Sequence, residues 1–189
     1  MSAIAQSIGG EPVTTKLAMK MEDSLQAFAV RAACFIGELE VPFSEEFDGH
    51  DFGATHVIAY VGDEPVGTVR VRWFQSFAMP ERLAVMQRFR GHNIGQMLLE
   101  RCRKLAESRG CNMLYAQALP ADVKYWEKQG WRRLVPEQAG AGDAKRIVAV
   151  VKAVDPSKPL PDVEAPEAVV LRREPQLDST GMPRGMISN

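Results

Sequence analysis

Apolar residues recur at helical spacing near the start of the chain. In EDSLQAFAVRAACFIGELE, residues 22–40, they stand mostly three or four positions apart, at Leu25, Phe28, Ala32, Phe35, Ile36 and Leu39. This spacing predicts an amphipathic helix. Asp23 or Ser24 would cap its start, because a side-chain oxygen there accepts a hydrogen bond from a free helical amide. The preceding segment PVTTKLAMKM, residues 12–21, predicts a first strand.

The pattern then changes to strands. THVIAYV and VGTVRVRWF, residues 55–61 and 66–74, are rich in β-branched and aromatic residues, and GDEP between them predicts a hairpin. ERLAVM, residues 81–86, predicts a further strand that leads into RFRGHNIGQMLLE, residues 88–100. From Ile94 to Leu105 the apolar residues fall on one face of a predicted helix, which Gly110 ends.

Beyond Gly110, strand and helix alternate. NMLYAQAL, residues 112–119, predicts a strand, and PADVKYWEKQ, residues 120–129, predicts a short helix that Gly130 ends. WRRLVP and RIVAVVK, residues 131–136 and 146–152, predict two closing strands. Clustered strands followed by this alternation predict a mixed α/β domain with antiparallel and parallel pairing.

Composition narrows the class of protein. The 189 residues are 46% hydrophobic, which is enough for one sizeable core. Lys and Arg number 23 against 24 Asp and Glu, so no global positive charge favours a nucleic acid as partner. The cysteines, Cys34, Cys102 and Cys111, are odd in number and lack metal-ligand spacing. They indicate reduced thiols, and we expect no bound metal.

The two ends of the chain differ in sequence pattern from its centre. We expect residues 1–12 to be flexible, residues 13–153 to form the domain, and residues 154–189 to be a tail that contains six of the 12 prolines. Within this tail a strand near residues 168–173 is the one predicted element. Neither a secretory leader nor a run of about 18 apolar residues is present, so we expect a cytoplasmic protein with no membrane partner.

The stretch RFRGHNIGQMLLE has the features of an anion site. A strand that turns into a helix leaves the first helical amides unpaired, and small residues such as Gly91 and Gly95 would allow an anion to approach them. Asn93 stands where a third glycine would be expected, and asparagine is the residue that best tolerates a left-handed backbone after glycine. The pattern alone leaves a phosphate site and an ordinary capped helix open. The glycine spacing disfavours a Rossmann site.

ERLAVMQRFRGHNIGQMLLERCRKLAESRG, followed by YWEKQGWRRL, closely resembles the GNAT superfamily of N-acetyltransferases. The resemblance covers residues 13–153 and implies the GNAT fold, a mixed sheet of six to seven strands flanked by about four helices. It also implies acetyl-CoA as co-substrate, bound through the pyrophosphate by the loop of Arg90, Gly91, His92, Asn93, Ile94 and Gly95. In the family, the preceding strand, here Leu83, Ala84 and Val85, binds the pantetheine arm.

VRAACFIGELE and the segment after it resemble the subgroup with a VRxxVFxxE-type first helix and an acidic loop. Within that loop Glu45, Asp48 and Asp51 would attract a cationic amine if they line the acceptor pocket. A solvated charged face is the alternative. His56, which alternates with Val57 along a strand, is better explained as a packed histidine than as a base.

Acetyl transfer to an amine requires a neutral amine, a site for the developing oxyanion and a proton for the thiolate. The resemblance implies that a backbone amide near Leu83 polarises the thioester carbonyl and that Glu81 takes the amine proton through water. A solvated Glu81, or one paired with Arg70 or Arg72, is the alternative. Arg72 is a candidate contact for a substrate carboxylate or a structural ion-pair partner.

The general acid is the main departure from the family. Alignment of Gly130 and Trp131 with the family motif FYxxxGF puts Trp126 where the catalytic tyrosine stands. Tyr125, one residue earlier, would then face the core, because one residue turns a helix by about 100°. Either Tyr125 reaches the sulfur through a local shift or the thiolate leaves without a dedicated acid, and we favour the second.

The sequence therefore predicts an N-acetyltransferase that uses acetyl-CoA and a primary amine of a small molecule or protein, by direct transfer in a ternary complex. Two alternatives are a catalytically weak acyl-CoA-binding regulatory domain and an acyltransferase that uses longer donors to make a homoserine-lactone type product. Members of the superfamily often dimerise, so the resemblance makes a homodimer a candidate assembly.

Overall fold

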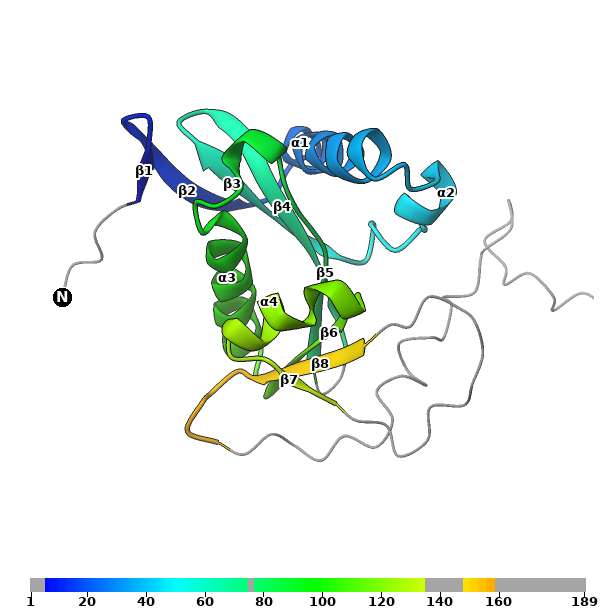
Figure 1. Ribbon diagram of the computed structural model, residues 1–189, viewed down its shortest axis with the longest axis vertical. Helices are drawn as coiled ribbons and strands as arrows, with labels where there is room; N and C mark the ends of the chain where they lie inside the picture. The colour runs from blue at the N-terminus through cyan, green and yellow to red at the C-terminus, as the bar shows by residue number, and fades with distance from the viewer. Residues whose placement is uncertain (1–5, 75–76, 135–147, 159–189) are drawn as a thin grey trace, which may run out of the picture.

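The computed structural model describes residues 6–74, 77–134 and 148–158. They form a mixed eight-stranded sheet in the order β1-β2-β3-β4-β5-β6-β8-β7 (Figure 1). Neighbouring strands are antiparallel except β5 and β6, which are parallel. The strands are β1 Ser7–Ile8, β2 Glu11–Leu17, β3 Thr55–Val61, β4 Glu64–Trp73, β5 Phe77–Val85, β6 Met113–Ala118, β7 Arg132–Arg133 and β8 Val148–Ala153.

Helices pack on both faces of this sheet. The long helix α3 lies at left and the short helix α4 near the centre in Figure 1, and α1 and α2 lie at upper right. The helical segments are α1 Met21–Arg31, the π-helix η1 Ala32–Glu38, α2 Phe43–Glu46, the 3₁₀ turn η2 Gln87–Phe89, α3 Ile94–Ser108, the 3₁₀ turn η3 Pro120–Asp122 and α4 Val123–Lys128. The predicted mixed α/β fold is therefore confirmed.

Alternation along β4 separates the two layers. Val69 and Val71 are fully buried in the main core together with Leu98 of α3. Gly67 lies on the same face, where an added Cβ would come 3.1 Å from Ile94, so a glycine lets α3 approach the sheet closely. Successive side chains of a strand point to opposite faces, so Arg70 points to the face that α1 covers.

Several element boundaries differ from the predictions. The sheet has eight strands rather than six or seven because β1, of two residues, was too short to leave a pattern, whereas β7 lies within the predicted strand WRRLVP. β1 pairs with β2, so the described sheet begins at Ser7. Helix α1 begins at Met21, and Asp23 lies in its first turn, where its carboxylate accepts from the Met19 and Lys20 amides.

The predicted tail strand near residues 168–173, and most of the segment between β7 and β8, lie outside the described residues. Among those described, no helix is long and apolar enough to cross a membrane.

Candidate active site

The parallel strands β5 and β6 separate soon after they begin. Phe77 pairs with Met113 and Ala78 with Leu114, and the described parts of the strands show no pairing beyond these two. The second half of β5 therefore lacks a neighbouring strand on one side. An extended ligand can form main-chain hydrogen bonds with such an edge.

Two cavities lie beside the unpaired half of β5, and Leu83 and Tyr125 line both of them. The larger one, about 450 Å³, is lined by residues that include Glu81, Gln117 and Leu119. A smaller cavity of about 290 Å³ lies at the turn before α3, against Val85 and the residues from Phe89 to Gln96 other than His92. Both cavities include Leu83 of β5 and Tyr125 of α4 in their lining.

The turn before α3 has the backbone that the sequence predicts. Asn93 is the N-cap of α3 and adopts the left-handed conformation, with φ 55° and ψ 14°. Gly91 also has a positive φ, of 83°. The first helical hydrogen bond runs from the Met97 amide to the Asn93 carbonyl at 3.0 Å, so the amides of the first turn have no partner within the helix. These amides and the helix dipole favour an anion at the smaller cavity.

Gly95, in the first turn of α3, lies close to Tyr125 of α4. A Cβ added at this position would lie 2.9 Å from the Tyr125 hydroxyl oxygen, closer than ordinary van der Waals contact. Space at this residue is therefore limited by Tyr125, and a glycine leaves the backbone of the first turn accessible. The limited space and the amides without helical partners favour a small anionic group at this turn.

Arg90 is held at the edge of the same cavity. Its Nε donates to the Val85 carbonyl at 2.9 Å, and its guanidinium pairs with Glu38 at the end of η1. About half of the Arg90 side chain is exposed, so it can reach a phosphate after it exchanges Glu38 for that anion.

Strand β5 contains a bulge at the centre of the site. Glu81 pairs with Arg70 and Ala84 with Thr68, so two residues of β5, Arg82 and Leu83, oppose the single residue between them on β4. Arg82 has a φ of 51°, a left-handed backbone that residues with a Cβ rarely adopt. A bulge of this kind turns the following backbone and re-aims its groups. Leu83, which lines both cavities, is the residue that follows.

Glu81 lines the larger cavity but is also ion-paired. Arg70 Nε donates to Glu81 Oε1 at 2.8 Å, and Arg72 Nε lies 4.0 Å from the same oxygen. The salt bridge considered from the sequence is therefore present, chiefly with Arg70. The guanidinium of Arg72 lies over the Phe74 ring at 5.2 Å, and Arg72 is absent from the described lining of both cavities.

The acidic loop faces arginines rather than the larger cavity. Asp48 receives two hydrogen bonds from Arg70, at 2.6 and 2.7 Å, and Asp51 pairs with Arg31 and Arg70. Glu45 is exposed, and no residue of this loop belongs to the described lining of either cavity. This geometry differs from the expectation that Glu45, Asp48 and Asp51 line an acceptor pocket. The physical reason is that buried guanidinium groups need carboxylate partners.

The acidic loop, Glu81 and the arginines around them form one cluster with equal numbers of guanidinium and carboxyl groups. Burial acts to raise the pKa of Asp48, but the hydrogen bonds and charge of Arg70 outweigh it and hold that pKa below its usual range. For Glu46 the balance is reversed, because burial raises the pKa of its carboxyl more than Arg31 lowers it. The cluster combines four guanidinium groups with four carboxylates: Arg31, Arg70, Arg72 and Arg82 with Glu46, Asp48, Asp51 and Glu81.

Tyr125 and Trp126 exchange the positions expected from the sequence. Trp126 is buried in the main core and packs edge-on against Trp131, with ring centroids 4.8 Å apart. Tyr125 is 40% exposed and lines both cavities. The expectation that Tyr125 faces the core is thus wrong, because Val123 and Trp126 form the buried side of the short helix α4. Burial raises the pKa of Tyr125, so its hydroxyl keeps its proton at neutral pH.

His56 behaves as a packed histidine. It is 4% exposed, its ring lies edge-on to Phe28, and its Nε2 is 3.3 Å from the Asp51 carbonyl oxygen. Burial lowers the pKa of His56 against the opposing effect of Asp51. Among the described residues, no three His, Cys, Asp or Glu side chains are grouped in a way that would hold a metal ion.

Comparison with known proteins agrees with this geometry. A sequence model of the Acetyltransferase (GNAT) family matches residues 24–131, more than half of the chain. The chain belongs to the GNAT acetyltransferase family. This membership makes it a transferase of the acyltransferase class.

Individual relatives are consistent with this GNAT assignment. The chain is 31% identical over 116 residues to the uncharacterized N-acetyltransferase YjcF of Bacillus subtilis, covering 61% of this chain and 83% of YjcF. Its fold is similar to that of a putative N-acetyltransferase from Lactobacillus plantarum, with a TM-score of 0.68, 21% identity, and coverage of 75% and 98% of the two chains. An aminoglycoside 6′-N-acetyltransferase solved with coenzyme A has a TM-score of 0.62 at 16% identity, over 77% of this chain and 99% of that one.

Sequence reasoning missed two features of the GNAT site. Arg82 has the ordinary pattern of a strand residue, and nothing in ERLAVM signals a left-handed backbone at an arginine. Phe35, expected on the apolar face of a helix, packs against Val30, Cys34 and Ala84 and also lines the larger cavity. Phe35 lies in the π-helix η1, a wider turn that the apolar spacing did not predict.

Proposed function

We propose that the chain is an N-acetyltransferase that transfers an acetyl group from acetyl-CoA to a primary amine of a small molecule or a protein. Leu83 and Tyr125 carry this proposal, because each lines both the cavity beside the anion-binding turn and the larger cavity next to it. Two substrates bound in adjoining cavities can react directly in a ternary complex. The fold neighbour solved with coenzyme A supports a CoA-linked donor.

In this proposal the smaller cavity takes the pyrophosphate and the free edge of β5 takes the pantetheine arm. The amides of the first turn of α3 and the guanidinium of Arg90 bind the phosphates. The backbone of Leu83, Ala84 and Val85 pairs with the arm, since the second half of β5 lacks a strand neighbour on that side. The amine enters the larger cavity, where Glu81 and Tyr125 both contribute to the lining.

Each residue then has one chemical task. Glu81 accepts the ammonium proton through a water molecule, and the neutral nitrogen attacks the thioester carbonyl carbon. The Leu83 amide donates to the carbonyl oxygen as it gains negative charge. When the carbon–sulfur bond breaks, the Tyr125 hydroxyl gives its proton to the departing sulfur. The phenolate then takes the remaining extra proton of the nitrogen, which leaves a neutral amide, the free thiol of CoA and a protonated Tyr125. The place of Tyr125 in the lining of both cavities favours this acid over unassisted departure of the thiolate.

One experiment separates this function from its alternatives. Acetyl-CoA is titrated in a thermal-shift assay, and thiol release is then measured over a panel of primary amines. Binding with amine-dependent thiol release supports the transferase. Binding without release for any amine supports the regulatory acyl-CoA-binding domain, and the absence of both rejects the two ideas together.

Donor length and assembly are tested in parallel. Acetyl-, hexanoyl- and dodecanoyl-CoA are compared at one concentration with the best amine, and preference for the longest donor would favour the alternative with long acyl chains. A homodimer stays a prediction that light scattering of the full chain measures directly.

A further inference from the structure

The bulge of β5 depends on a backbone conformation that its residue does not favour. Arg82 has a φ of 51°, yet it carries a long side chain rather than a hydrogen. For residues with a Cβ this region is crowded, and it persists where surrounding contacts hold it. The following residue, Leu83, has no register partner on β4 or β6 among the described residues. Its direction is therefore set by the bulge.

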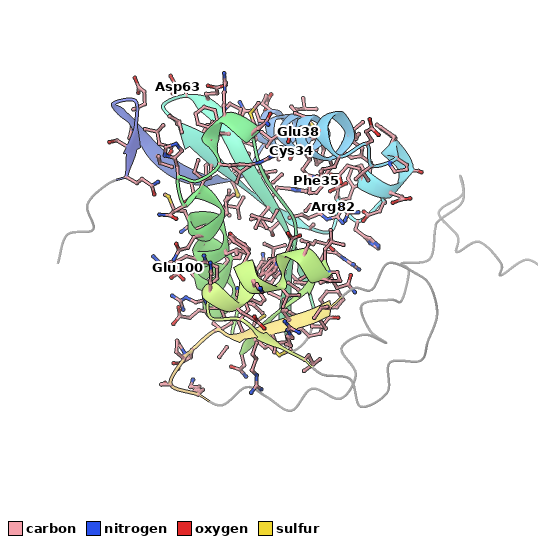
Figure 2. All side chains as sticks on the ribbon, in the orientation of Figure 1. Cys34, Phe35, Glu38, Asp63, Arg82 and Glu100 are labelled. Atoms are coloured by element: carbon pink, nitrogen blue, oxygen red, sulfur yellow. The ribbon has the colours of Figure 1, made fainter. Side chains whose placement is uncertain are left out.

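The contacts of the Arg82 guanidinium come from the acidic loop. Nη2 donates to the Glu45 carbonyl oxygen at 2.6 Å and lies 3.1 Å from Asp48 Oδ2, and Nε lies 3.0 Å from Glu46 Oε2. Figure 2 shows Arg82 on the side of the molecule where the loop and α2 lie. About a quarter of the side chain is exposed, so these contacts are only partly screened by solvent.

The loop is itself fixed from the opposite side. Arg31 of α1, which is fully buried, pairs with the Glu46 carboxylate and donates to the Glu46 carbonyl oxygen at 2.8 Å. Asp48 is held by the two hydrogen bonds from Arg70 of β4. The carboxylates that hold Arg82 are thus anchored to a helix and to the central strand. A bulge tied to such a support cannot relax without breaking several charged contacts.

We propose that Arg82 is a positioning residue, through which the acidic loop of residues 45–48 holds the β5 bulge in its left-handed form and aims the Leu83 amide at the reacting carbonyl. This inference rests on the proposed acetyl transfer. It gives the acidic loop a role inside the catalytic machinery, in place of the attraction of a cationic substrate.

The comparison of Arg82→Ala with Arg82→Gly tests the proposal. Both remove the guanidinium, but glycine adopts a positive φ without strain, whereas alanine does not. If Arg82 acts through the backbone, alanine should lower kcat by about 10- to 100-fold, less than the roughly 100- to 1,000-fold cost of removing an oxyanion donor altogether, while glycine should stay within roughly threefold of the parent. The KM for acetyl-CoA should change less than kcat in both variants.

Two further variants serve as matched controls. Glu40 is exposed and also has a positive φ, of 54°, so Glu40→Ala and Glu40→Gly should differ in melting temperature but leave kcat unchanged. Arg133 is half exposed and pairs with Glu127 on the surface, so Arg133→Ala controls for the loss of one positive charge.

Each other outcome rejects the positioning role. Equal losses of kcat in the alanine and glycine variants would mean that the guanidinium itself acts on the reaction, and a change confined to the KM of the amine would mean that Arg82 binds the acceptor. A kcat equal to that of the parent in both variants would mean that the contacts between Arg82 and the acidic loop are not needed for catalysis.

A readout without an acceptor keeps this test apart from the proposed function. In ¹H–¹⁵N spectra the Leu83 amide should move on addition of acetyl-CoA in the parent and in Arg82→Gly, and should move much less in Arg82→Ala. If the Leu83 amide signal shifts equally in all three proteins, the positioning role of Arg82 is rejected even if no amine is turned over. If the expected spectral response appears but thiol release is absent with every amine, the transferase function fails while the positioning of Leu83 stands.

Discussion

Gly95 gives the most direct test of the anion-binding turn. A methyl group at this position would lie 2.9 Å from the Tyr125 hydroxyl oxygen, so Gly95→Ala forces the tyrosine to move. Alanine favours a helix over glycine by about 1 kcal/mol, which offsets part of the steric cost, and the melting temperature should change little. We expect the larger effect on CoA binding, a loss of roughly threefold to tenfold.

A double-mutant cycle isolates the contact between the two residues. Tyr125→Phe removes the oxygen that the new methyl group would meet, so Gly95→Ala should cost less in the phenylalanine background. The expected coupling is about 0.5–1.5 kcal/mol in CoA affinity, measured by isothermal titration calorimetry of all four proteins. Gly53→Ala is the control, because an added methyl group there meets nothing within 4 Å.

Gly95→Glu adds charge to bulk. A carboxylate about 5 Å from a phosphate, at an effective dielectric constant near 20, is repelled by about 3 kcal/mol before salt screening. Even half of that energy weakens CoA binding by about tenfold, and the full value by about 100-fold. Parental affinity in this variant would refute the assignment of this turn to the pyrophosphate.

Three more predictions test other residues of the site. Asn93→Gly should leave the CoA dissociation constant within about threefold, since glycine adopts the left-handed backbone freely, whereas Asn93→Val should lower the melting temperature; equal melting temperatures would contradict the strain argument. Tyr125→Phe should lower kcat by roughly 10²-fold at neutral pH with a smaller change in KM, and an unchanged kcat would exclude Tyr125 as the acid. The pKa of Asp48 is depressed in the folded protein, so the stabilisation from its carboxylate is complete above the unfolded pKa of about 4 and is lost as pH falls further. Below that pH, the free energy of unfolding measured in urea should therefore fall more steeply for the parent than for Asp48→Asn. Parallel plots of the free energy of unfolding against pH for the two proteins would contradict this.

Short sequence patterns predicted the parts of the structure whose conformation depends on a residue and its immediate neighbours. Asparagine at position 93 indicated a left-handed residue, and the structure confirms that conformation. The β-branched and aromatic residues of β3 and β4 and the turn between them likewise predicted the hairpin. In each case the residue type and its immediate neighbours determine the conformation, so a reading of short segments is sufficient.

Features that depend on distant partners could not be predicted in this way. The acidic loop looked like a surface for a cationic substrate because its partners, Arg31 and Arg70, are 15 or more residues away in sequence. The position of Tyr125 depended on which aromatic ring of α4 packs against Trp131, and helix periodicity cannot decide between adjacent residues without the sheet. The bulge at Arg82 results from the register of β5 with β4, which single-strand patterns do not contain.

The π-helix η1 links changes in the larger cavity to changes in the smaller one, because it places one residue at each. Phe35 lines the larger cavity, and Glu38, one turn later, pairs with Arg90 at the smaller one; Figure 2 labels both on the segment that follows α1. Deletion of one residue to restore an ordinary helix would rotate both side chains at once. Libraries aimed at a new acceptor should therefore vary Phe35 and Leu119 by substitution and keep the length of this segment constant.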